Sequence, residues 1–168
     1  GCNETIQTIR MMQEQTIETQ LHYVSIYLFD TTKSRYIIKE EKVDKVREIT
    51  EEDYRPYAST PLFDALGFTL TELKRTIERE KESLGYVTII TDGYENASCE
   101  YNLNSVKTLI DELKEKNVIF SFIGANIDAA DYGKKLHIEN FMQFEQTDAK
   151  TGAMWKRERE ARLRSNAK

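Results

Sequence analysis

Two short apolar runs, separated by one amphipathic segment, constrain the fold of this chain more than any other feature. The runs are residues 86–91 and 118–123, and neither contains a charged side chain. Strands that are apolar on nearly every side are typical of a parallel sheet covered on both faces. Between the runs, apolar residues recur at helical spacing: Leu103, Val106, Ile110 and Leu113. This strand–helix–strand order predicts an α/β fold.

The rest of the chain continues the alternation. Helices are predicted at 4–20, from Thr60 onward and at 128–136, with Asn3 and Thr60 as N-caps. Strands are predicted at 21–29, 35–39 and 141–145, of which the first two form a hairpin at the sheet edge, and 40–58 is a connecting loop. This order predicts a doubly wound, mostly parallel sheet with helices on both faces. We expect residues 1–150 to form this domain and 151–168 a charged C-terminal helix or tail.

Length and charge narrow the functional classes. The 168 residues suffice for one domain with a buried core, and the formal net charge of -5 argues against a general nucleic-acid binder. No apolar stretch approaches the roughly 20 residues that cross a bilayer, so no membrane partner is expected. No signal peptide is visible, although the chain does not begin with Met. Cys2 and Cys99 lack metal-like spacing, and we expect a reducing, cytoplasmic setting.

Polar residues directly follow three of the predicted strands. In open parallel sheets, ligands bind beyond the carboxyl ends of the strands, and these residues should lie there. They form three short segments: 30–32, 91–93 and 124–126. Thr60, at a predicted helix start, should face the same edge. A carboxylate from Asp92 and a hydroxyl from Thr60 are the oxygen ligands that Mg²⁺ or Mn²⁺ prefers. On composition alone, the simpler interpretation is favoured, in which Thr60 is only an N-cap and Asp92 only a turn residue before Gly93.

Segments 59–62, 89–93 and 123–128 resemble a bacterial branch of the von Willebrand factor A family, and the similar element order runs through about residues 3–145. The resemblance implies a metal-ion-dependent adhesion site. Its ligands come from an Asp-x-Ser-x-Ser turn after the first strand, a Thr before a later helix and an Asp after the fourth strand. Thr60 matches that Thr, and Asp92 matches that last Asp.

The Asp-x-Ser-x-Ser turn and its strand have no counterpart in this sequence, because the first predicted helix begins near Asn3. The similar segment 30–34 follows what the resemblance makes the second strand, and we interpret it as a turn. We expect the strand and turn to precede Gly1 in the natural protein; the alternative is a degenerate member that binds without metal. As given, the chain should bind Mg²⁺ or Mn²⁺ weakly or not at all, and a neighbouring molecule could fill the missing-strand gap in an oligomer.

The resemblance implies a non-enzymatic interaction module without catalytic residues, whose protein partner offers a carboxylate to the ion. The candidate metal ligands are Thr60 and Asp92. The candidate partner-binding residues are Ser59, Gly93 and Asn126.

The alternative is a Mg²⁺-dependent phosphatase or phosphotransferase of the haloacid dehalogenase type. Asp30 would be its nucleophile and Asp92 would hold the Mg²⁺. That chemistry usually needs a second Asp two residues after the nucleophile, where this chain has Thr32. The two histidines, His22 and His137, are isolated and are assigned no catalytic role.

Overall fold

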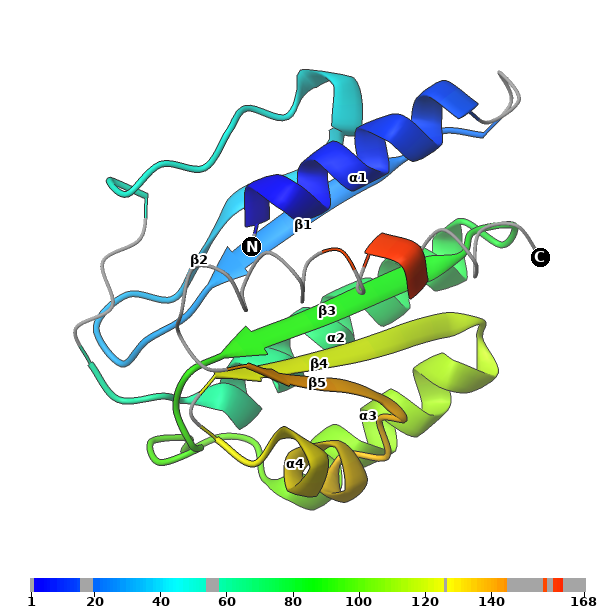
Figure 1. Ribbon diagram of the computed structural model, residues 1–168. Helices are drawn as coiled ribbons and strands as arrows, with labels where there is room; N and C mark the ends of the chain where they lie inside the picture. Colours follow the sequence, from blue (N-terminus) through cyan, green and yellow to red (C-terminus); the bar gives the residue numbers. More distant parts are fainter. Residues whose placement is uncertain are drawn as a thin grey trace. The chain divides into compact units, whose positions relative to one another are not determined.

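The structure is a computed structural model that describes residues 2–15, 20–53, 58–125, 127–144, 156 and 159–161. It divides into two compact units. Unit 1 contains residues 1–28, 34–57 and 147–168, and unit 2 contains residues 29–33 and 58–146. Each unit is described by itself (Figure 1). No helix in the described part of the chain is both long and apolar enough to cross a membrane.

Unit 1 is built from a helix and a hairpin. Its elements are α1 (Cys2–Gln15), β1 (Tyr23–Leu28), β2 (Arg35–Lys42) and the short 3₁₀ helix η1 (Val43–Lys45). The strands β1 and β2 pair antiparallel, which confirms the predicted hairpin. Its buried apolar cluster joins all four elements: Ile6, Val24, Ile38, Val43 and Val46.

Two predictions for unit 1 are wrong in detail. Asn3 is not an N-cap, because α1 begins at Cys2 and the Asn3 amide pairs with the backbone of Ile49 through bonds of 2.8 and 2.7 Å. Strand β2 continues to Lys42, so the start of the predicted 40–58 loop is strand. Charged side chains misled the prediction there, because an edge strand can point them into water. Residues 16–19 of the predicted first helix lie outside the described residues.

Unit 2 alternates helices and strands: α2 (Leu62–Arg79), β3 (Gly85–Thr91), α3 (Leu103–Glu115), β4 (Val118–Ala125), α4 (Ala129–Lys135) and β5 (Asn140–Phe144). The strands form a parallel sheet in the order β3-β4-β5, and the arrowheads of β3 and β4 point the same way in Figure 1. The predicted parallel pairing of the two apolar runs is therefore confirmed. Strand β3 was expected inside the sheet, but among the described residues it pairs with β4 alone and lies at an edge.

The core of unit 2 lies against one face of β4. Alternate residues of this strand, Val118, Phe120 and Phe122, are buried in a cluster to which α2, α3 and α4 all contribute. The Phe122 ring stacks on Tyr132 of α4, with 5.7 Å between ring centroids. This packing gives an α/β unit around a three-stranded parallel sheet.

The three helices of unit 2 differ in which residues bind the free N–H groups of their first turns. Asn102 and Asp128 cap α3 and α4 through their side chains. Thr60 does not cap α2, contrary to the prediction, because the helix begins at Leu62 and its N-cap position is Pro61. Side chains from another loop bind the first N–H groups of α2 instead. The predicted charged helix or tail over 151–168 falls largely outside the described residues.

Candidate functional site

The carboxyl end of β3 brings Thr60 beside the Asp92–Gly93 turn. A Cβ atom on Gly93 would lie only 2.6 Å from Thr60 Oγ1, so the threonine side chain rests directly on the glycine. Two backbone contacts hold Thr60 there: its N–H donates to Asn96 Oδ1 at 2.8 Å, and its carbonyl accepts from Asn96 N–H at 3.2 Å. The two candidate metal-binding segments thus meet, although a helix and a strand separate them in sequence.

Two oxygen-bearing side chains at this edge are available to an external ligand. The Asp92 side chain is exposed, and no hydrogen bond joins its carboxylate to a described residue. Thr60 is half-buried, and its Oγ1 likewise makes no hydrogen bond within the described part of the chain. The turn beneath them is fixed by the buried Thr91, whose hydroxyl donates to the Gly93 carbonyl at 3.0 Å and accepts from its N–H at 3.2 Å.

Glu95 fastens the β3–α3 loop (residues 92–102) to the start of α2. Its carboxylate accepts the Phe63 N–H of the first helical turn at 2.8 Å. It also accepts the Ala97 and Ser98 N–H groups and the Ser98 hydroxyl, at 2.7–2.9 Å. Glu95 therefore takes the place of an N-cap, where a negative charge is favourable. Burial alone would raise the pKa of Glu95, but these hydrogen bonds outweigh it and lower the pKa.

Asp64 makes the reciprocal connection from α2 to the loop. Its carboxylate accepts three consecutive backbone N–H groups at 2.8–2.9 Å: Cys99, Glu100 and Tyr101. Its own N–H donates to Ser98 Oγ at 3.0 Å. Burial would raise the pKa of Asp64, but the three N–H donors stabilise the carboxylate and lower it. The Tyr101 ring lies so close to Gly67 that a Cβ there would be 2.1 Å away, which closes the loop onto the helix.

Tyrosines join the same loop to α4. The Tyr132 hydroxyl accepts the Glu95 N–H at 2.8 Å, and the Tyr94 hydroxyl accepts the Asp128 N–H at 3.2 Å. The two rings are 5.8 Å apart. Tyr94 is 51% exposed, so a tethered aromatic ring lies on the surface next to Gly93. The loop that carries Asp92 is therefore fixed from two sides.

The remaining predicted residues are placed as follows. Ser59 is exposed and precedes Thr60, and Gly93 lies under the Thr60 side chain. Asn126 lies outside the described residues. Asp30 closes a turn, as expected, because its Oδ1 accepts Thr32 N–H, Thr32 Oγ1–H and Lys33 N–H at 2.6–2.7 Å.

Thr60 and Asp92 supply only part of the ligands that a divalent metal ion requires. The described residues contain no group of three or more His, Cys, Asp or Glu side chains placed to hold a metal. A hydroxyl and a carboxylate from Thr60 and Asp92 suit a hard cation that keeps most of its waters. They fit part of such a site, and the other ligands would come from water or from a partner.

Sequence reasoning missed Asp64, Glu95 and Asn96, which hold the site together. One weak signal was present: Asp64 lies in the first turn of its helix, where acidic residues are favourable. Nothing in the local sequence indicates that Glu95 reaches a different helix.

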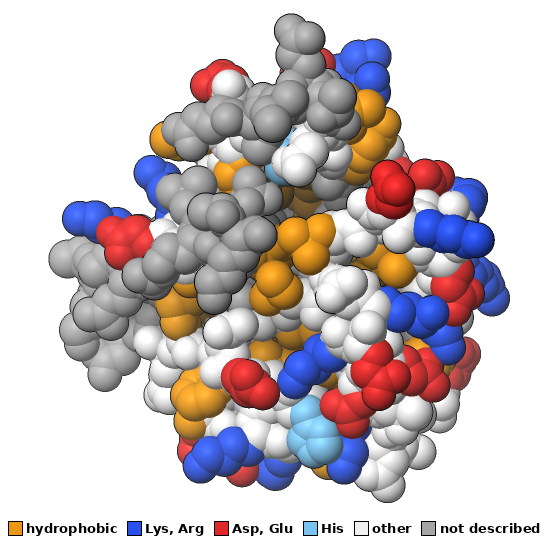
Figure 2. Space-filling model, turned by 90° about the vertical axis from the view of Figure 1, so that its right-hand side faces the viewer, with side chains coloured by type: hydrophobic (Ala, Val, Ile, Leu, Met, Phe, Trp, Pro, Cys, Tyr) orange, Lys and Arg blue, Asp and Glu red, His pale blue; other side chains and the backbone are white. Residues whose placement is uncertain are grey.

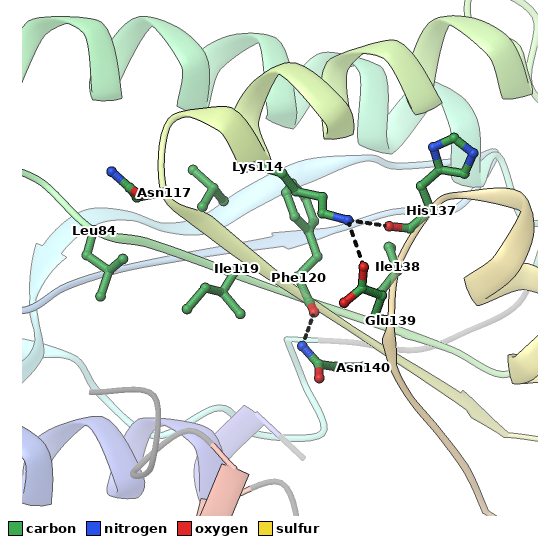
Figure 3. Close-up of a pocket in the computed structure, with 10 residues that line it drawn as sticks. Leu84, Lys114, Asn117, Ile119, Phe120, His137, Ile138, Glu139 and Asn140 are labelled. Carbon is green, nitrogen blue, oxygen red and sulfur yellow. Dashed lines mark hydrogen bonds and ion pairs between the residues drawn. The ribbon is translucent and has the colours of Figure 1, made fainter. Parts of the chain in front are cut away.

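A hollow of about 340 Å³ lies at the opposite, amino ends of β4 and β5 (Figure 3). Its floor includes Leu84 and Ile119. Lys114 Nζ donates to the His137 carbonyl at 2.9 Å and lies 3.7 Å from the Glu139 carboxylate. Charged groups here pair with one another, and Figure 2 shows acidic and basic side chains intermixed around a histidine. The hollow contains none of the predicted site residues.

Comparison with known proteins identifies no relative. No protein family, curated protein or solved structure matches the chain.

Proposed function

We propose that this chain is a non-enzymatic protein-interaction module of the von Willebrand factor A type, which binds its partner through a divalent cation. The observation that supports this most strongly is the position of Thr60 on the Asp92–Gly93 turn. The resemblance assigns these two residues to one site, and the proximity of Thr60 to the Asp92–Gly93 turn supports that assignment. The exposure of Asp92 agrees with a ligand that approaches from outside.

The order of the elements also supports the proposal. In the family, the strands belong to one doubly wound, mostly parallel sheet with helices on both faces, and we propose this architecture for the chain. The parallel order β3-β4-β5 and the antiparallel β1-β2 hairpin agree with it. Ligands of such sheets bind beyond the carboxyl ends of the strands, where Thr60 and Asp92 lie.

The proposed ion is Mg²⁺ or Mn²⁺, and it would bind the carboxylate of a partner protein. Thr60 and Asp92 would hold it from this chain, while Ser59, Gly93 and Asn126 would border the partner. Two oxygen donors rarely outcompete the hydration of Mg²⁺. The isolated chain should therefore bind the ion weakly, and the ion and partner should bind together more tightly than either alone.

A random peptide library tests this function. Peptides retained by the immobilised chain in Mn²⁺ should carry Asp or Glu and should elute with EDTA. Asp92→Asn should lower their retention by about tenfold or more, since a charged ligand is lost. The matched control is Asp44→Asn, which removes an exposed carboxylate from unit 1.

Two results would overturn the proposal. The first is retention that is insensitive to EDTA and unchanged in Asp92→Asn. The second is hydrolysis of an aryl phosphate by the wild-type chain that is abolished in Asp30→Asn, because this would support the phosphatase alternative.

A further inference from the structure

Tyr94 places an exposed aromatic ring beside the proposed cation site. It follows Asp92 by two residues, so the Cα atoms of the two are at most about 7 Å apart. Its hydroxyl accepts the Asp128 N–H at 3.2 Å, and its ring lies 5.8 Å from that of Tyr132. Tyr94 therefore reaches from the end of β3 to the start of α4, along the edge where parallel sheets bind their ligands.

The Tyr94 ring is both fixed and accessible. Tyr94 is 51% exposed, whereas Tyr132, the other member of the pair, is buried. Within the described residues, Lys135 lies over the Tyr132 ring at 5.9 Å, and no basic side chain lies over Tyr94. A ring that is already held in place loses little conformational entropy when a partner covers it, and tyrosine is enriched among the residues that dominate binding.

The charges beside the ring favour a basic side chain as its occupant. The Asp92 and Asp128 side chains are both exposed, and neither makes an ion pair within the described part of the chain. A bound Mg²⁺ or Mn²⁺ carries two positive charges, which Asp92 and the partner's carboxylate would balance. Asp128 would remain as a negative charge beside the Tyr94 hydroxyl. An apolar side chain placed there would remove water from this carboxylate without offering it a partner.

We propose that Tyr94 and Asp128 bind a Lys or Arg side chain of the partner, within three residues of the carboxylate that reaches the ion. This basic residue would add selectivity to the proposed metal-dependent binding, on which its role rests. The cation would lie over the Tyr94 ring, within about 6 Å of its centre, and face the Asp128 carboxylate. An extended partner segment advances about 3.4 Å per residue, so three residues are enough to span the distance from Asp92 to Tyr94.

Peptide selection in Mn²⁺ tests this recognition. Among random peptides that the immobilised chain retains in Mn²⁺ and releases with EDTA, Lys and Arg should be enriched within three residues of the acidic residue. One such peptide is then compared with a copy in which norleucine, an uncharged residue with an unbranched aliphatic chain, replaces the basic residue. The wild-type chain should bind the basic peptide about fivefold more tightly, as for a cation on an exposed ring beside a carboxylate.

Two variants should lower this ratio towards one. Asp128→Asn removes the charge but keeps a good N-cap for α4. Tyr94→Leu removes the ring, while Tyr94→Phe, which retains it, should keep most of the preference. Tyr23→Leu, which removes an exposed aromatic ring from β1, is the matched control and should leave the ratio unchanged.

Two outcomes would overturn the role of Tyr94 and Asp128. The first is a set of acidic, EDTA-released peptides in which basic residues are not enriched, or in which apolar residues take their position. The second is a ratio that stays unchanged in Asp128→Asn or in Tyr94→Leu. Equal weakening of both peptides in Tyr94→Leu belongs here, because it would mean that the ring only holds the loop. The proposed metal-dependent function would survive both outcomes, whereas the absence of any EDTA-released peptide would overturn function and selectivity together.

Discussion

At the scale of single residues, three side chains determine where the candidate site lies. Glu95 and Asp64 bind the β3–α3 loop and the start of α2 to each other through hydrogen bonds from backbone N–H groups. Asn96 adds two bonds to the backbone of Thr60. Because these contacts fix the loop, the Thr60 side chain rests on Gly93. The site is thus organised by three residues that are not among its proposed ligands.

Gly93→Ala tests the contact between Thr60 and the turn. The new Cβ would lie 2.6 Å from Thr60 Oγ1 and should force the hydroxyl to rotate away. We expect the free energy of unfolding to change by about 1 kcal/mol or less, since one short side chain changes rotamer, while metal-dependent peptide retention is lost. Thr60→Val, which removes the hydroxyl at constant shape, should have the same effect on retention. Full retention by both variants would show that Thr60 is not a ligand.

Glu95→Gln tests whether Glu95 holds the β3–α3 loop against the first turn of α2. The amide removes a charge that accepts four hydrogen bonds and turns an NH₂ group towards N–H donors. We expect the free energy of unfolding to fall by about 2 kcal/mol, as for other charged hydrogen-bond acceptors. Denaturant unfolding measures this. Glu100→Gln, at an exposed position in the same loop, should change it by less than about 0.5 kcal/mol, and equal losses in the two variants would contradict the role of Glu95.

The sequence indicated Thr60 and Asp92 as a pair only through the resemblance of their segments to a known family. Asp64 and Glu95 could not be predicted, because each binds a segment that is distant along the chain. The N-cap assigned to Thr60 was wrong for the same reason. A local rule assumes that a helix start is capped by its own preceding residue, but here Glu95 from another loop binds the first turn.

At the scale of elements, hydrophobic pattern predicted the strands best where they are buried. The two apolar runs became β3 and β4, paired in parallel as expected. The pattern was least informative at edges, because charged residues are tolerated there and no periodicity marks where a strand ends. That explains why β2 is longer than predicted. It also explains the position of β3, since an apolar run indicates burial of its side chains but not the presence of two neighbouring strands.

The junction between α2 and the β3–α3 loop should make stability depend on pH. The pKa values of Glu95 and Asp64 lie below their ordinary values of 4.5 and 3.8 in the folded state. The stability that these two ionised carboxylates contribute is therefore fully present at pH values above their ordinary pKa values. It is lost as the pH falls through their lower, folded-state pKa values. Denaturant unfolding should show stability that declines below about pH 4.5. Glu95→Gln should show a shallower decline, and parallel curves for the two proteins would contradict this origin.

At the scale of the whole molecule, the chain forms two compact units that both draw on separated stretches of sequence. The sequence predicted a single domain over residues 1–150 and a sheet with a gap next to its second strand. Sequence patterns predict which segments are strands, but they do not specify which strands pair at their edges.

Paramagnetic broadening by Mn²⁺ in NMR spectra of the full chain tests the central claim, that Thr60 and Asp92 together hold a divalent cation. We expect weak binding, with broadening centred on the amides of residues 60, 92 and 93. Mg²⁺ should reverse it, Asp92→Asn should abolish it and Asp44→Asn should not. Broadening centred instead on the Asp111–His137 pair at the amino end of the sheet, or unchanged in Asp92→Asn, would contradict the claim.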